Sequence, residues 1–121
     1  MNGNLAQAVG RAFAADGPLA RSDPHFLARA AQDTLAARIA QAVAGRETLV
    51  AEAGTGVGKT FAYLVPLLLS GRRALISTAT KSLQDQLFLR DLPRLRDALR
   101  VPVRMALLLS LIHISEPTRP Y

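Results

Sequence analysis

The chain has 121 residues, half of them apolar, and its 15 basic and 9 acidic residues give a net charge of +6. A chain of this size forms at most one small globular domain, and because it has no cysteine it cannot build a disulfide scaffold, a cysteine-ligated metal site or a thiol nucleophile. The apolar runs are far shorter than the ~20 residues of a membrane span and the first residues lack a secretory signal pattern, so we expect a cytoplasmic protein without a membrane partner.

The first 26 residues predict a short helix followed by a linker. Residues 4–15 are rich in alanine and favour a helix, and the turn residues 16–18 (Asp-Gly-Pro) are typical of its end. Between residues 27 and 44 apolar side chains recur at every fourth position, which predicts an amphipathic helix closed by Gly45. The expected apolar face consists of Leu27, Ala31, Leu35, Ile39 and Val43.

The segment from residue 48 to residue 108 alternates apolar runs with helical patterns. The apolar runs at 48–52, 73–78 and 101–108 predict three strands. Helices are predicted over 59–70, where Gly71 stops the helix, and over 81–90, with a further helical piece after Pro93 up to about Arg100. Alternating strands and helices pair in parallel, so we predict an α/β fold with a parallel sheet.

Residues 53–60 match a phosphate-binding loop that joins a predicted strand to a predicted helix. Glycines let the backbone approach an anion closely, so that successive N–H groups point at phosphate oxygens. Lys59 adds a compact positive charge for the β- and γ-phosphates, and the Thr60 hydroxyl is a ligand for the accompanying Mg²⁺. The alternative is a glycine-rich turn that binds nothing. The loop comprises Ala53, where the general pattern has glycine, Gly54, Thr55, Gly56, Val57, Gly58, Lys59 and Thr60.

The segments on either side of this loop extend the match to most of the chain. They are residues 14–20 (AADGPLA), 29–32 (RAAQ), 50–64 (VAEAGTGVGKTFAYL) and 76–87 (ISTATKSLQDQL). With them, residues 10–108 resemble the amino-terminal part of the DinG/XPD-type superfamily 2 DNA helicases, especially the bacterial DinG-like branch. The resemblance implies a RecA-like lobe whose first part is residues 27–108, and an intact protein that couples ATP hydrolysis, with Mg²⁺, to the unwinding of DNA.

The resemblance also implies roles for two groups of polar residues. Arg29 and Gln32 match an upstream motif that reads adenine; three positions apart on a helix they would share a face, and an amide can donate to and accept from the base edge. The alternative is that both are solvated polar residues. Four residues match a motif that contacts one strand of DNA, although a threonine there commonly only caps a helix. They are Thr78, Thr80, Lys81 and Gln86.

Residues 109–121 differ abruptly in composition from the rest, because they contain no alanine and hold two of the four isoleucines. They resemble the translation of a sequencing adapter, and we interpret them as a non-native tail; a genuine C-terminal tail is the alternative. In the resembled family, cysteines that ligate an iron–sulfur cluster follow at about this point. We therefore expect a truncated lobe that binds nucleotide weakly, does not unwind DNA alone, and is poorly soluble because its sheet edges are unpaired.

Two other functional classes remain open from the sequence. A P-loop ATPase that does not act on DNA would share the loop but should lack the features at Gln32 and at residues 78–86. A nucleic-acid-binding module without catalysis would rest on the positive charge alone.

Overall fold

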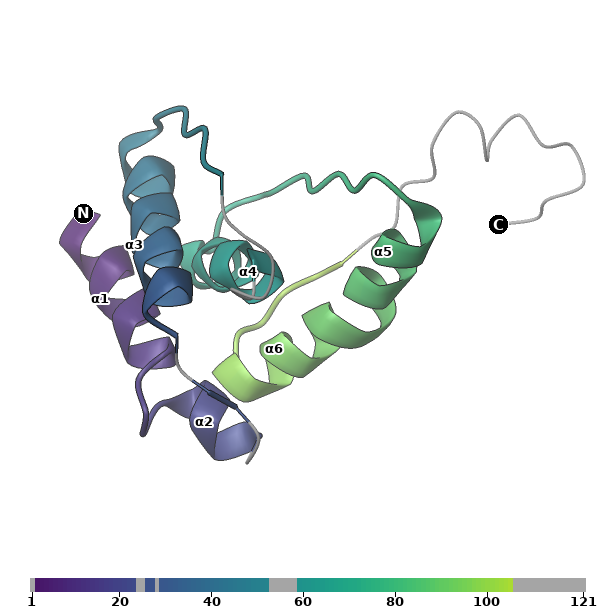
Figure 1. Ribbon diagram of the computed structural model, residues 1–121, viewed down its shortest axis with the longest axis horizontal. Helices are drawn as coiled ribbons and strands as arrows, with labels where there is room; N and C mark the ends of the chain where they lie inside the picture. Colours follow the sequence, from purple (N-terminus) through teal and green to yellow (C-terminus); the bar gives the residue numbers. More distant parts are fainter. Residues whose placement is uncertain (1, 24–25, 28, 53–58, 106–121) are drawn as a thin grey trace, which may run out of the picture.

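The computed structural model describes residues 2–23, 26–27, 29–52 and 59–105, and the regular structure in these ranges is helical (Figure 1). Three of the segments, α5 (Lys81–Gln86), η1 (Leu87–Asp91) and α6 (Leu92–Leu99), follow one another directly and form one long helical arm. No helix in the described ranges has the length and apolar character needed to cross a membrane. The helices are α1 (Asn2–Ala12), α2 (Pro18–Ser22), α3 (Ala30–Gly45), α4 (Lys59–Ser70), α5 (Lys81–Gln86), the π-helix η1 (Leu87–Asp91) and α6 (Leu92–Leu99).

The predicted parallel sheet is wrong, because no strand occurs among the residues that the structure describes. Residues 48–52, 73–78 and 101–105 are irregular; residues 106–108 of the third predicted strand lie outside the described ranges. Parallel strands need hydrogen-bonded neighbours and burial on both faces. Val50 and Leu75 are instead 93% and 83% exposed. Ile76 and Met105, from two of the predicted strands, line one cavity of about 620 Å³.

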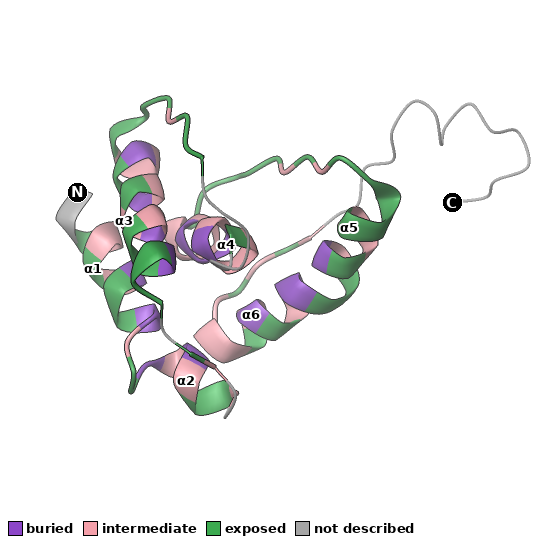
Figure 2. Cartoon of the chain, viewed as in Figure 1, coloured by how far each residue is buried: buried purple, intermediate pink, exposed green. Residues whose placement is uncertain are grey.

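The hydrophobic core lies where α1, α3 and α4 pack against one another, and α6 packs on α4 and α2 (Figure 2). The largest side chains that are fully buried include Val9, Leu64 and Leu95, from three different helices. The side chains of α3 that are fully buried in the core are small, Ala36 and Ala40, while Leu35 packs against the core and is partly buried. Small residues at these positions let α3 lie close to α1 and α4.

The buried face of α3 is therefore offset from the predicted one. Leu27 is 71% exposed and lies before the helix, which begins at Ala30. Ala31 is exposed, whereas Gln32 in the next position is buried. The remaining predicted face, Leu35, Ile39 and Val43, is only partly buried.

Of the two helix ends predicted at glycines, one differs in detail from the prediction. Gly45 is the last residue of α3, and Arg46 takes the left-handed conformation (φ 55°) that ends the helix, with its N–H donating to the Val43 carbonyl. Gly71, with φ 71°, ends α4 as predicted.

Pro93 does not interrupt the helical arm. The N–H of Leu92 donates to the Leu87 carbonyl five residues earlier, so the wider π-turn of η1 lies immediately before the proline. Pro93 stands in the first turn of α6, directly after this wider turn.

The short helix α2 was not predicted. Gly17 occupies its N-cap position and Pro18 its first turn, so the residues that we interpreted as a turn also begin a helix.

Candidate functional site

The described part of the predicted phosphate-binding loop is its last two residues, which begin α4. Lys59 is exposed and Thr60 half-buried, both in the first turn of a 12-residue helix. The backbone N–H groups of a first helical turn have no partner within the helix, and the helix dipole adds positive charge there. Residues 53–58 lie outside the described ranges. The predicted start of this helix directly after the loop is confirmed.

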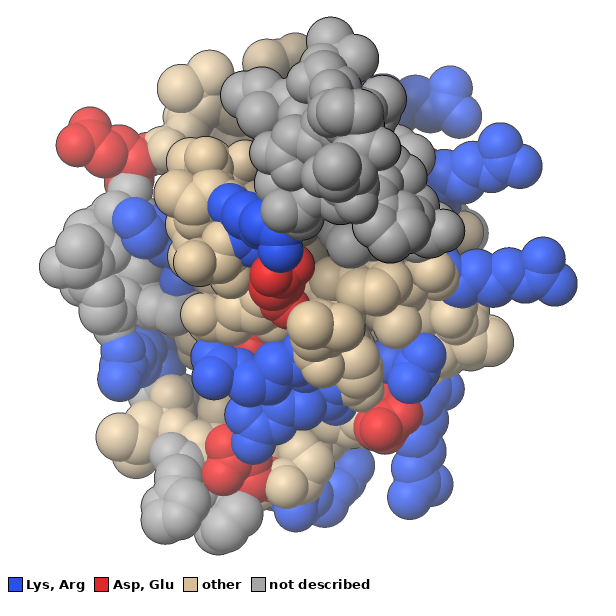
Figure 3. Space-filling model, turned by 90° about the vertical axis from the view of Figure 1, so that its right-hand side faces the viewer, with Lys and Arg blue, Asp and Glu red and all other residues tan. Residues whose placement is uncertain are grey.

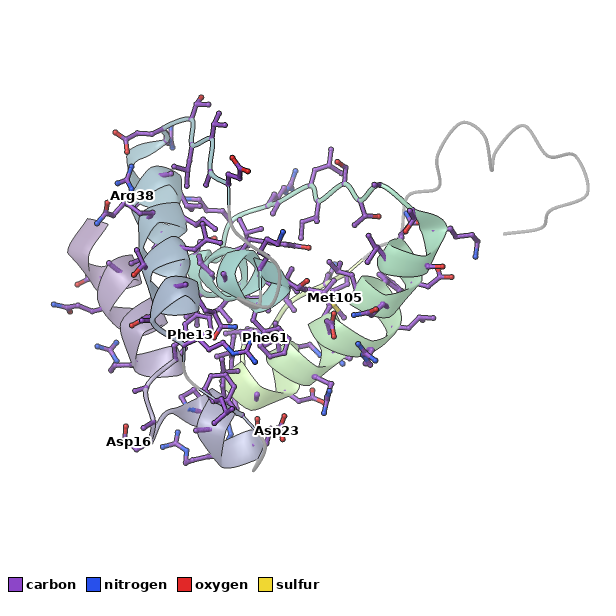
Figure 4. The ribbon with its side chains drawn as sticks, viewed as in Figure 1. Phe13, Asp16, Asp23, Arg38, Phe61 and Met105 are labelled. Carbon is purple, nitrogen blue, oxygen red and sulfur yellow. The ribbon has the colours of Figure 1, made fainter. Side chains whose placement is uncertain are left out.

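The first turn of α4 is anchored in the core by its neighbour in sequence. Phe61 is partly buried and packs against the hydrophobic core cluster to which Phe13, the residue after α1, belongs (both are labelled in Figure 4). Ala62 and Leu64 are fully buried on the same helix. Because core packing holds this turn in place, the position of the Lys59 and Thr60 backbone is fixed by α4.

Sequence reasoning missed one polar side chain beside Thr60. Tyr63, one turn later on α4, is partly buried, and the side chains of Thr60 and of Asp91 on η1 influence its pKa. Burial raises the pKa of Tyr63 above its usual value, the hydrogen bond with Thr60 lowers it, and the negative charge of Asp91 raises it again. Its i+3 spacing from Thr60 was the available signal, since such side chains are neighbours on a helix.

Asp91 is one of the two polar residues found buried in the described part of the chain, the other being Gln32. The Arg90 Nε lies 3.4 Å from the Asp91 Oδ1, and the Arg90 side chain is 60% exposed. A buried carboxylate is tolerated when it is paired in this way. The π-helix carries Asp91 and lies in the arm that packs on α4.

The two predicted adenine contacts lie in different surroundings. Arg29 is exposed and extended (φ −123°, ψ 132°) immediately before α3, so it does not share a helical face with Gln32. Gln32 lies in the first turn of α3 and is 5% exposed, within the packing of α3 against α1 and α4. The premise of a shared helical face is therefore corrected, because α3 begins one residue after Arg29.

Two of the four predicted DNA-contact residues precede α5, and the other two are its first and last residues. Thr80 is the N-cap of α5, and its Oγ1 accepts a hydrogen bond from the N–H of Leu83 at 3.1 Å. The Thr78 hydroxyl donates to the Thr80 carbonyl at 3.2 Å. Lys81 forms an ion pair with Asp85 at 3.0 Å, and Gln86, the last residue of α5, is exposed. The capping role considered as the alternative for Thr80 is thus present.

The described residues offer Thr60 as a candidate cation ligand. They contain no cluster of three or more His, Cys, Asp or Glu side chains able to hold a metal ion. Mg²⁺ is commonly held by one or two protein groups together with substrate phosphates and water, so a single hydroxyl at Thr60 is compatible with it.

The surface of the molecule is strongly basic. On the face shown in Figure 3, Lys and Arg side chains are more abundant than Asp and Glu, and the Asp and Glu side chains lie among them. Such a surface attracts polyanions but does not by itself select one.

Comparisons with known proteins place these residues in a family. A model described as "DEAD/DEAH box helicase" matches residues 30–108. The ATP-dependent DNA helicase YoaA of Escherichia coli (strain K12) is 48% identical over 96 residues, which cover 79% of this chain and 15% of that protein. YoaA of Haemophilus influenzae is 45% identical over 100 residues, 83% of this chain and 16% of that protein.

A third relative matches a shorter part of the chain and belongs to the DinG-like branch that the sequence resembles. The ATP-dependent DNA helicase DinG of Salmonella typhimurium is 46% identical over 79 residues, which cover 60% of this chain and 11% of that protein. No solved structure matches the chain. The chain spans only 15% and 16% of the length of the two YoaA relatives.

Proposed function

Because the chain belongs to the DEAD/DEAH box helicase family, we propose that it is the ATP-binding front part of an ATP-dependent DNA helicase. The observation that carries the proposal is the position of Lys59 and Thr60 in the first turn of α4, directly after the glycine-rich loop and inside the matched region. The loop residues Ala53, Gly54, Thr55, Gly56, Val57 and Gly58 would surround the phosphates with backbone N–H groups.

Each of the two described loop residues has a separate task in this proposal. The exposed Lys59 ammonium neutralises charge on the β- and γ-phosphates, and the Thr60 hydroxyl binds Mg²⁺. Phosphoryl transfer depends on such positioning and charge neutralisation rather than on covalent chemistry by the protein. Further catalytic groups, such as an acidic metal site, would have to come from outside the sequence 53–60.

We assign the adenine to Arg29 and Gln32. The exposed Arg29 guanidinium is free to stack on or donate to the base from the surface. Gln32 is buried, so its amide would contact the edge of the adenine that faces the protein interior, or would stabilise the packing around α3.

We assign single-stranded DNA to the start of the helical arm. The Thr80 oxygen accepts a bond from Leu83, which leaves its own O–H to donate to a phosphate. The Lys81–Asp85 pair is about half-exposed, and exposed pairs of this kind contribute little, so Lys81 can exchange Asp85 for a phosphate. Thr78 and Gln86 flank these two residues and complete the proposed contact.

The helicase activity belongs to a longer protein, because this chain spans only 15% of its Escherichia coli YoaA relative. An iron–sulfur cluster would likewise need ligands from outside this chain, which has no cysteine. The test is ATP hydrolysis by the full product of the gene with and without single-stranded DNA. We expect stimulation by DNA in the wild type and loss of hydrolysis in Lys59→Ala, with Arg94→Ala as a control that removes one exposed positive charge on α6. Hydrolysis that is indifferent to DNA would identify a P-loop ATPase of another class.

A further inference from the structure

The cavity of about 620 Å³ lies between α4 and the helical arm. Its walls come from α4, the irregular residues 71–78, the arm and residues 102–105, which run back beside the arm (Figure 1). Most of the side chains that line it are apolar, among them Leu68 on α4 and Met105, which is labelled in Figure 4. Cavities of about 300–1,000 Å³ with apolar walls and a few polar groups are typical sites for small organic groups.

The aromatic side chain in this cavity is Phe88, which belongs to the π-helix η1. The chain has four phenylalanines. Phe13 belongs to the hydrophobic core and Phe26 and Phe61 pack against it, whereas Phe88 is partly buried and lines the cavity instead. Single π-turns are frequent at functional sites. Because the core does not use the Phe88 ring, the ring is a flat surface on which a planar group can stack.

Among the described residues that line the cavity, every charged one is an arginine, and all three are exposed: Arg72, Arg73 and Arg104. Arg72 is already engaged, because its Nη1 donates to the Val43 carbonyl at 2.7 Å. The ion pairs of the described residues are formed by other basic side chains, so no carboxylate there neutralises Arg73 or Arg104. An apolar cavity with an aromatic wall and a positive rim is complementary to a ligand that combines a planar base with an anion.

The cavity is continuous with the residues that we assign to DNA. Thr78, one of those residues, is part of its lining. Lys81, Gln84 and Phe88 follow one another at the spacing i, i+3 and i+7 that marks one face of a helix, and the last two also line the cavity. Lys81 and Phe88 are about 10 Å apart along the arm, a distance of a few nucleotides. A single strand that contacts the start of the arm therefore passes the mouth of the cavity.

Resting on the proposed function, we propose that this cavity receives one unstacked base of single-stranded DNA, which stacks on Phe88 while the neighbouring phosphates contact Arg73 and Arg104. Proteins that bind single strands commonly combine aromatic rings for the bases with a positively charged groove for the backbone, and the cavity has both. Stacking does not select a particular base, so the contact is tolerant of sequence.

The first test compares the affinity of the 121-residue chain for two fluorescein-labelled single strands of equal length, by anisotropy. One strand is oligothymidylate, and the other has abasic sites in place of its central bases. We expect the abasic strand to bind at least about fivefold more weakly, the effect of one lost base–aromatic stack. Phe88→Leu should bind oligothymidylate as weakly as the abasic strand and leave the abasic affinity unchanged. Leu89→Ala, at a neighbouring side chain that is 71% exposed and outside the cavity lining, is the matched control.

The second test addresses the arginines through the salt dependence of binding. Arg73→Ala and Arg104→Ala should each weaken both strands equally and reduce the slope of log affinity against log salt by about 0.7, the effect of one lost phosphate contact. Arg94→Ala, which removes an exposed charge from α6 outside the cavity lining, should keep the wild-type slope.

The outcomes separate this inference from the proposed function. Equal wild-type affinity for the two strands would overturn the inference and leave DNA binding through phosphates in place; this comparison uses the unaltered chain, so it holds even if a variant fails to fold. A base-dependent difference that persists in Phe88→Leu, or wild-type salt slopes in both Arg73→Ala and Arg104→Ala, would also overturn it. A wild-type chain that binds neither strand would overturn the inference together with the assignment of DNA to the arm, whereas the nucleotide-binding part of the proposed function would stand.

Discussion

The Oγ1 of Thr80 accepts a hydrogen bond from the backbone N–H of Leu83 at 3.1 Å. Thr80 has extended backbone angles (φ −133°, ψ 156°) and stands immediately before α5, which is the geometry of an N-cap. The residue that we assign to DNA therefore already has a structural task. The two tasks are compatible because capping uses an oxygen lone pair, whereas a phosphate contact would use the O–H.

Removing this cap should destabilise the start of the helical arm. We expect Thr80→Ala to lower the free energy of unfolding by about 1 kcal/mol, since it leaves a helical N–H without its side-chain partner. Thr80→Ser keeps the oxygen and should stay close to the wild type. Urea denaturation followed by circular dichroism measures the difference; a Thr80→Ala chain as stable as Thr80→Ser would contradict the capping role.

The stability of the chain should depend on the ionisation of Tyr63 at alkaline pH. Burial is the main reason why the pKa of Tyr63 lies above its usual value of 10.0, with the hydrogen bond to Thr60 acting against it and Asp91 adding to it. The folded chain therefore retains a proton that the unfolded chain gives up above pH 10.0. Tyr63 therefore makes its full contribution to the free energy of unfolding below pH 10.0. The contribution is lost as the pH rises through the pKa that Tyr63 has in the folded chain, which is higher.

The measurement compares the free energy of unfolding between pH 9 and 12 in Tyr63→Phe and Tyr121→Phe. We expect the decline above pH 10 to be shallower in Tyr63→Phe, because that variant has lost the group with the raised pKa. Equal slopes in the two variants would show that Tyr63 titrates as it does in the unfolded chain.

Gly17 should not tolerate a side chain. A Cβ added there would lie 2.2 Å from the carbonyl oxygen of Arg11 and 3.0 Å from that of Ala12, and both are backbone atoms that cannot move aside cheaply. We expect Gly17→Ala to destabilise the chain by about 1–3 kcal/mol, as overpacking does.

Gly10 offers the matched control for this substitution. It lies inside α1, and an added Cβ there would meet no atom within 4 Å. Gly10→Ala should therefore stabilise the chain by up to about 1 kcal/mol through helix propensity. Thermal melting of both variants checks the pair, and similar melting temperatures would contradict the packing around Gly17.

The helices were largely predictable because their signals are local. Alanine-rich periodicity, the loop before Lys59 and the stop at Gly71 all act within a few residues of the element that they define. The strands were wrongly predicted, because an apolar run such as residues 73–78 becomes a strand only where a neighbouring strand pairs with it. Leu75 is instead exposed beside an open cavity.

Some residues of the candidate site could also be predicted from the sequence, and others could not. The sequence pattern identifies Lys59 and Thr60, which are adjacent in the chain. It does not identify Tyr63 with Asp91, because their proximity depends on how the arm packs on α4 and on a π-turn that no residue pattern announces. The helical face of α3 was misjudged because alanines, which look neutral in a pattern, are buried there in preference to leucine and isoleucine.

The central claim is that this chain binds the phosphates of ATP through Lys59, and calorimetric titration of Mg²⁺-ATP into the 121-residue chain tests it most directly. The account predicts weak but measurable binding that Lys59→Ala reduces by about tenfold or more, because a charge-assisted contact to phosphate is lost. Arg94→Ala, which removes an exposed positive charge on α6, should bind as the wild type does. Equal binding by wild type and Lys59→Ala would contradict the claim.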